Sequence, residues 1–153
     1  MNNYYDIANE DIEEAEDRYV AKKYNKCAVW CQQSSEKYLK YILVDKLGIT
    51  GEGDTQKDKE DASIVNSHNL KRIYDRINED DKVLSIPAAT LFALTNYYVK
   101  ARYPGEGYVD IDPETAGELI DHAKLVKKAA DTFLESIPVE VHLQALANKY
   151  SKQ

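Results

Sequence analysis

Apolar residues recur every three or four positions along most of the chain, which is the spacing of one face of an α-helix. This pattern predicts five helices, at about residues 4–23, 26–47, 67–77, 87–102 and 113–136. Glycine and proline are scarce and grouped between these segments, so short strands joined by tight turns are not favoured. We therefore expect an all-α fold, an up-and-down helical bundle of about five helices.

Each predicted helix has one stripe of residues that should face the core. In chain order, these residues are Tyr5, Ala8, Ile12, Ala15, Tyr19, Ala28, Cys31, Ser35, Tyr38, Leu39, Ile42, Leu43, Leu70, Ile73, Tyr74, Ile77, Leu91, Leu94, Thr95, Tyr98, Val99, Ala116, Leu119, Ile120, Ala123, Val126, Ala130, Phe133 and Leu134. The first helix also has a dense acidic face that includes Asp11, which we interpret as solvated. Ser67 is the expected N-terminal cap of the third helix.

The length of 153 residues fits a single domain. We predict a bundle over residues 1–137 and a C-terminal tail or short helix over residues 138–153. Residues 48–66 hold three glycines followed by a charged run, which predicts a mobile loop inserted between the second and third helices.

Charge and apolar run length restrict the partners of the chain. The net charge is −7, whereas proteins that hold nucleic acid by its phosphates usually have a broad positive surface. The N-terminus lacks the pattern of a signal peptide, and no apolar run has the length of a membrane span. Cys27 and Cys31 lie four apart in a helical pattern, which favours buried thiols over a disulfide. We expect a cytoplasmic protein with neither DNA nor a membrane among its partners.

The sequence has no Gly-rich phosphate loop, no paired-cysteine zinc spacing and no HExxH motif, so we expect no cofactor and no metal site. One candidate for anion binding lies at the start of the third helix, where His68 and Arg72 share a face near the positive end of the helix dipole. Spacing alone favours a different interpretation, a polar helix end in which His68 bonds to a neighbouring backbone carbonyl.

A second candidate is Arg102-Tyr103 at the end of the fourth helix. A guanidinium can bind phosphate and a tyrosine ring can stack on a base, but the same residues suit an ordinary helix end. In the second helix, Glu36 and Lys40 are spaced as a weak helical ion pair, and Gln32 and Ser35 put polar groups at the edge of the buried stripe. We interpret this third set as structural.

Taken in order, four stretches and the last helix resemble the HEPN family of small helical prokaryotic domains. The stretches are Gln32-Gln33, Glu36-Lys37-Tyr38-Leu39-Lys40, Ser67-His68-Asn69-Leu70 and Ala101-Arg102-Tyr103-Pro104. The resemblance covers nearly the whole chain apart from residues 48–66 and the tail. It implies a bundle that pairs into a homodimer, with a minimal nucleotidyltransferase as the partner protein in a toxin–antitoxin pair.

The resemblance also implies one of two activities. Many HEPN toxins cut RNA without a metal, using an arginine followed after four to six residues by a histidine, whereas other members bind nucleotides without cutting. No histidine stands at that spacing after Arg18, Arg72, Arg76 or Arg102. We therefore expect a non-catalytic binder of a nucleotide or RNA, with His68, Arg72, Arg102 and Tyr103 as ligand-binding candidates, or a partner-docking module. A ribonuclease toxin in which the fold brings Arg102 and His68 together is the alternative.

Overall fold

The computed structural model describes residues 3–136 and residue 147. Within these residues the chain is all-α, as predicted, and has no strand. The elements are α1 (Tyr4–Val20), α2 (Tyr24–Lys40), the π-helical turn η1 (Tyr41–Lys46), α3 (Gln56–Val65), α4 (Leu70–Ile77), α5 (Ala88–Arg102) and α6 (Pro113–Ser136). The predicted C-terminal tail or short helix, residues 138–153, lies outside the described residues apart from position 147.

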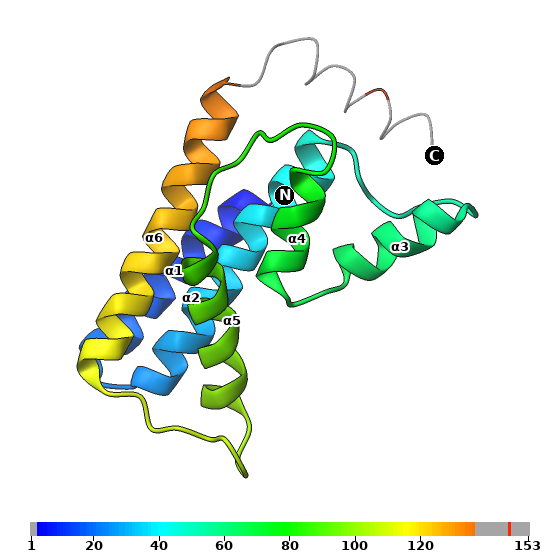
Figure 1. The fold of residues 1–153 in the computed structure, drawn as a ribbon. Helices are drawn as coiled ribbons and strands as arrows, with labels where there is room; N and C mark the ends of the chain where they lie inside the picture. The colour runs from blue at the N-terminus through cyan, green and yellow to red at the C-terminus, as the bar shows by residue number, and fades with distance from the viewer. Residues whose placement is uncertain (1–2, 137–146, 148–153) are drawn as a thin grey trace.

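The helix α2 is the centre of the bundle and packs against α1, α4, α5 and α6. Figure 1 shows α1, α2, α5 and α6 side by side in an up-and-down arrangement, while α4 lies next to α5, beside the end of α2 that leads into η1. The α1–α2 turn and the loop from α5 to α6 lie together at the other end of the bundle (Figure 1). Residues on both sides of α2 are buried, including Cys27, Cys31, Tyr38 and Leu39, because neighbours cover most of its circumference.

Most of the predicted core positions are buried. Five of them, Tyr5, Tyr19, Tyr74, Thr95 and Leu134, are only partly buried. The prediction was wrong for Val99, which is 54% exposed because α5 is apolar on nearly all sides and only one side faces the core.

The prediction was also wrong for Asp11. This carboxylate is 6% exposed and forms an ion pair with Lys37 across the α1–α2 contact. Charge alone did not distinguish it from its solvated neighbours, because the difference depends on a cation of another helix.

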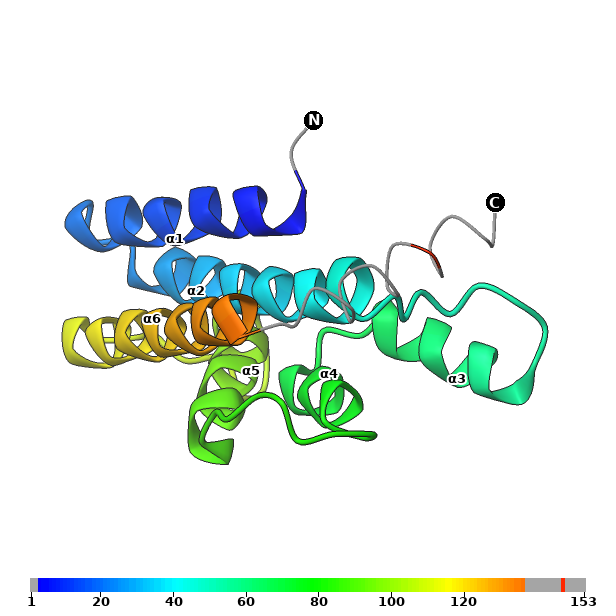
Figure 2. The same ribbon diagram turned by 90° about the horizontal axis from the view of Figure 1, so that it is seen from above.

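The segment 48–66, predicted to be a loop, contains the helix α3, which projects from the bundle (Figures 1 and 2). Its start is a capping box in which Thr55 and Asp58 each bond the other's backbone N–H. Its only buried residue, Asp61, accepts two hydrogen bonds from Arg76 of α4, at 2.7 and 3.3 Å. Gly51, at φ +77°, passes so close to Ala62 that a Cβ would overlap the backbone. The capping box and the contact of Asp61 with Arg76 therefore stabilise a helix in this charged segment, although glycines precede it.

The N-terminal cap of α4 is Asn69 and not Ser67. The Asn69 side chain accepts from the backbone N–H of Arg72, whereas the Ser67 hydroxyl accepts from the backbone N–H of Asn69 at 3.0 Å. The shift leaves His68 outside the helix, in the turn that leads into it.

Candidate functional site

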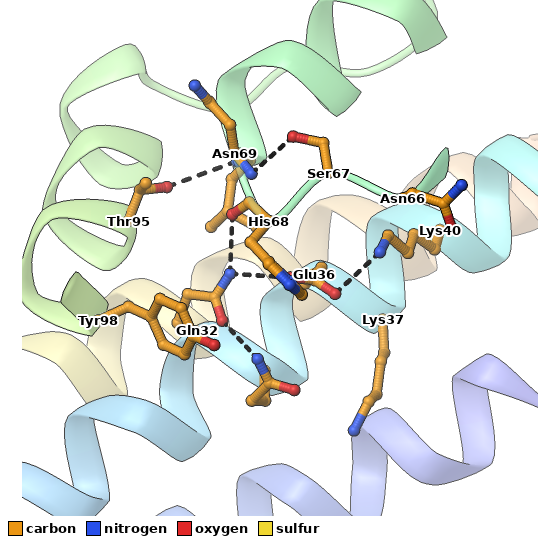
Figure 3. A network of polar contacts seen from close by, with 12 residues as sticks. Gln32, Glu36, Lys37, Lys40, Asn66, Ser67, His68, Asn69, Thr95 and Tyr98 are labelled. Atoms are coloured by element: carbon orange, nitrogen blue, oxygen red, sulfur yellow. Dashed lines mark hydrogen bonds and ion pairs between the residues drawn. The ribbon is translucent and has the colours of Figure 1, made fainter. Parts of the chain in front are cut away.

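A buried carboxylate lies where α2 meets the turn before α4. Glu36 is in the middle of α2, and Figure 3 shows how Lys40, Gln32 and His68 converge on it. Lys40 Nζ lies 2.9 Å from Oε2, and His68 Nδ1 lies 2.9 Å from Oε1. Gln32 Nε2 donates to Oε1 at 3.1 Å and to the backbone carbonyl of His68 at 3.0 Å. These contacts fasten the turn before α4 to the central helix.

The spacing of four between Gln32, Glu36 and Lys40 places all three on one face of α2. The sequence predicts a helical ion pair of small value between Glu36 and Lys40, and in the structure both side chains of this pair are buried, at 6% and 8% exposed. A buried charge without a partner is strongly unfavourable, so each group requires the other in this packing. These contacts agree with the interpretation that Gln32, Glu36 and Lys40 have a structural role.

Burial raises the pKa of the Glu36 carboxyl, but the hydrogen bonds from Lys40, Gln32 and His68 and the charge of Lys40 outweigh it. The net pKa is lower than the ordinary value, so Glu36 is ionised at neutral pH. The carboxylate can then accept a hydrogen bond from His68 Nδ1–H, and in the tautomer with its proton on Nδ1 the Nε2 atom is an acceptor.

Tyr98 of α5 joins this cluster to Arg102. The Tyr98 ring lies 6.0 Å from the ring of His68, measured between centroids (Figure 3). The Arg102 guanidinium carbon lies 5.2 Å from the Tyr98 ring centroid and 5.5 Å from that of Tyr103, and the guanidinium also contacts the Tyr98 hydroxyl. The fold therefore brings His68, Arg102 and Tyr103 into one region through a tyrosine that sequence reasoning placed only in the core.

Arg72 does not join them, because its guanidinium points toward α3. There it donates to the Ser63 hydroxyl at 2.9 Å and to the Ser63 carbonyl at 3.4 Å. Arg72 thus serves the contact between α3 and α4.

A groove of about 440 Å³ opens beside Arg102, at the end of the bundle where α1, α2 and the α5–α6 loop meet. Its walls include three cations, Arg18, Lys26 and Arg102, and two aromatic rings, Trp30 and Tyr108. Arg18 is also paired with Glu14, at 2.6 Å. Such a set combines guanidinium and ammonium donors with flat apolar surfaces in one concavity, which suits an anion that has an aromatic group.

Asn25, at the start of α2, holds the far wall of this groove in place. Its amide donates to the Val109 carbonyl at 2.8 Å, and its oxygen accepts from the Ile111 N–H at 2.9 Å. The loop from α5 to α6, which has Tyr108, is thereby tied to α2. Sequence reasoning missed Arg18, Lys26, Trp30 and Tyr108 as site residues, because they are scattered in the sequence and share no motif with Arg102.

In the part of the chain that the structure describes, no group of three or more His, Cys, Asp or Glu residues is placed to hold a metal ion. Nor does any of the described helices have the length and apolar character to cross a membrane.

The lowered pKa of Glu36 predicts how stability changes in acid. A carboxyl whose folded pKa is below its unfolded value stabilises the fold fully above the unfolded value, near 4.5, and this contribution is lost as the pH falls through the folded value. Glu36→Gln should be less stable at neutral pH by about 2 kcal/mol, because it leaves the Lys40 charge buried without its partner. Urea unfolding at several pH values should show the two proteins converging as the pH falls below about 4.5. A constant difference down to pH 3 would contradict the assignment.

One comparison with known proteins finds a family for this chain. The family model of the HEPN domain matches residues 1–133 of the 153. No curated protein and no solved structure matches the chain significantly. With nearly nine-tenths of its length matched, the chain belongs to the HEPN family.

Proposed function

We propose that this HEPN protein binds a nucleotide, or the phosphate-bearing end of an RNA, in the groove between α1, α2 and the α5–α6 loop, without cleaving it. The observation that supports this is the presence of Arg18, Lys26 and Arg102 around one concavity in a chain of net charge −7. Because the molecule as a whole is acidic, a small local cluster of cations favours a small anionic ligand over a long nucleic acid.

The aromatic residues narrow the ligand class further. Trp30 is half-buried and Tyr108 is 44% exposed, so both present ring surface to the groove. A base that stacks on either ring would place its phosphate within the reach of the cations, and stacking on an aromatic side chain contributes roughly 1–3 kcal/mol per base. Inorganic phosphate alone should therefore bind more weakly than a nucleotide.

Trp30 is the only tryptophan in the chain, so its fluorescence reports directly on the groove. Titration with ATP, GTP and their monophosphates should change this fluorescence in a saturable way. Arg102→Ala and Lys26→Ala should each raise the Kd about tenfold or more, because each removes a charge-assisted contact. Arg72→Ala is the matched control, since it removes a guanidinium that binds Ser63 of α3, and its Kd should be unchanged. No response to any nucleotide, or equal loss in all three variants, would contradict the proposal.

A ribonuclease is the second candidate, and the pairing of Glu36 with His68 is the observation that favours it. A buried carboxylate that holds Nδ1 leaves Nε2 able to accept a proton, as a general base requires. The His68 side chain is 62% exposed, so it is accessible to a substrate. Arg102 contacts the same tyrosine and would be the group that stabilises the phosphate.

Cleavage of a mixed-sequence RNA in the presence of EDTA separates the two candidates. Under our proposal the wild-type protein gives no cleavage above the buffer. Cleavage by the wild type that falls by a hundredfold or more in both His68→Ala and Arg102→Ala would overturn it in favour of the ribonuclease. Cleavage that neither substitution reduces would instead indicate a contaminating nuclease.

The exposed apolar side of α5 supports a further part of the proposal, a homodimer. Phe92 is 70% exposed and Val99 follows it seven positions later, so both lie on one face with Tyr103 at its end. Aromatic residues are enriched at protein interfaces, and the buried centres of homodimer interfaces are more apolar than the rest of the surface. We propose that a second copy of the chain covers this face, and that a nucleotidyltransferase is the partner protein of the pair.

Phe92→Asp combined with Val99→Asp should convert the protein from a dimer to a monomer, as measured by light scattering after size exclusion. Val20→Asp, a substitution at an apolar residue that is 81% exposed on α1, is the control and should remain dimeric. A wild type that is monomeric at micromolar concentration would contradict the homodimer. Co-expression with the product of the neighbouring gene tests the second partner, and a neighbour that is not a nucleotidyltransferase, or that fails to co-purify, would contradict it.

A further inference from the structure

The three cations of the cationic groove differ in what they contact. Arg18, in the last turn of α1, forms an ion pair with Glu14, and the two side chains are 35% and 34% exposed. Arg102 contacts two tyrosine rings, which have no charge to offset its own. Among the residues that the structure describes, Arg18 is the one cation of this groove that has a carboxylate partner. Lys26 and Arg102 are therefore the stronger sites for phosphate, and Arg18 suits a neutral part of a ligand.

The contact with Glu14 also fixes the orientation of the Arg18 guanidinium. Nε and Nη2 lie 2.8 and 2.6 Å from the same carboxylate oxygen, Oε1. A guanidinium has five N–H donors in one rigid plane, and this contact occupies the edge formed by Nε and Nη2. The other edge, formed by Nη1 and Nη2, keeps two parallel N–H groups. Arg18 can thus present a fork of two donors to a ligand while it stays paired with Glu14.

The rest of the groove offers few hydrogen-bond acceptors to a base. No Asp, Glu or Gln is among the described residues that line it. Its one amide, Asn25, already donates to the Val109 carbonyl and accepts from the Ile111 N–H. Adenine and cytosine have an exocyclic amino group, which proteins usually bind through Asn, Gln, Asp or Glu. In this groove such a group would have only the Tyr108 hydroxyl to replace a hydrogen bond to water.

Guanine has the complementary pattern of acceptors. Its O6 and N7 lie side by side on one edge, and an arginine fork donates to both at once. Trp30 and Tyr108 supply ring surface on which the base can stack. Lys26 and Arg102 then remain for the phosphates of the same nucleotide.

We propose that the ligand of the cationic groove is a guanine nucleotide, whose O6 and N7 bind the guanidinium of Arg18 and whose phosphates bind Lys26 and Arg102. Glu14 is a positioning residue, since it acts on the ligand by orienting Arg18. This inference rests on the proposed function, because it assigns the parts of a nucleotide bound in the same groove. It adds a preference for guanine over adenine.

Calorimetric titration of the full chain with GTP, ATP and inosine triphosphate tests the preference. Inosine triphosphate keeps O6 and N7 but lacks the 2-amino group of guanine. The wild type should bind GTP and inosine triphosphate with similar Kd values, and ATP about tenfold more weakly. Arg18→Lys keeps the charge but loses the fork, so its Kd for GTP should rise to that for ATP, while the Kd for ATP stays within about twofold of the wild-type value. Lys26→Ala is the matched control and should weaken both nucleotides equally.

The outcomes of this titration separate the guanine preference from the proposed function. Equal binding of GTP and ATP, with both weakened in Lys26→Ala, would overturn the guanine preference and leave the proposed function standing. Inosine triphosphate that binds as weakly as ATP would also overturn it, because the contact would then be with the 2-amino group. If the wild type binds none of the three nucleotides, the proposed function fails as well.

Glu14→Gln tests the positioning role. Loss of the carboxylate frees the Arg18 fork, so the preference for GTP over ATP should fall about threefold even if both nucleotides bind more tightly. Glu13→Gln is the control, because it removes the same charge at the neighbouring exposed position, and its preference should match the wild type. A preference that is unchanged in Glu14→Gln, or that falls equally in both variants, would contradict the role of Glu14.

Discussion

The ionised carboxylate of Glu36, buried in the central helix, is the interaction on which the arrangement of the site depends. A buried charge is tolerated only when it is paired and its oxygens are hydrogen-bonded, and here Lys40, Gln32 and His68 meet that requirement. Two of the three contacts involve the turn before α4, so the position of α4 relative to α2 follows from the pairing. The His68 ring in turn lies against Tyr98, which extends the constraint to α5 and to Arg102.

The arginines of the chain divide into two kinds by what they contact. Arg76 and Arg72 bind Asp61 and Ser63 of α3 and hold a projecting helix that buries little apolar surface of its own. Arg102 and Arg18, by contrast, line a groove with Lys26 and two aromatic rings. The chain as a whole has a net charge of −7, which disfavours the binding of extended nucleic acid. It does not prevent one small anion from entering the cationic groove.

The periodicity of apolar residues was sufficient to predict the bundle, and the order of several short motifs was sufficient to identify the family. The periodicity did not predict α3, because this helix depends on the Thr55 capping box and on the contact of Asp61 with Arg76. Of the residues that line the cationic groove, only Arg102 was a ligand-binding candidate from the sequence, while the candidates Tyr103 and His68 lie near it outside the groove. The remaining groove residues come from the end of α1, the start of α2 and the α5–α6 loop, which meet only after the bundle has formed.

The central claim is that the cationic groove holds the ligand while the Glu36 cluster is structural. Photo-crosslinking with an azidopurine nucleotide, followed by peptide mapping, tests this claim most directly because it identifies the residues next to the base. Our account predicts labelling of the peptides that contain Trp30 or Tyr108, and the labelling should be lost when unmodified nucleotide competes. Labelling confined to residues 66–76, around His68 and Arg72, would contradict it.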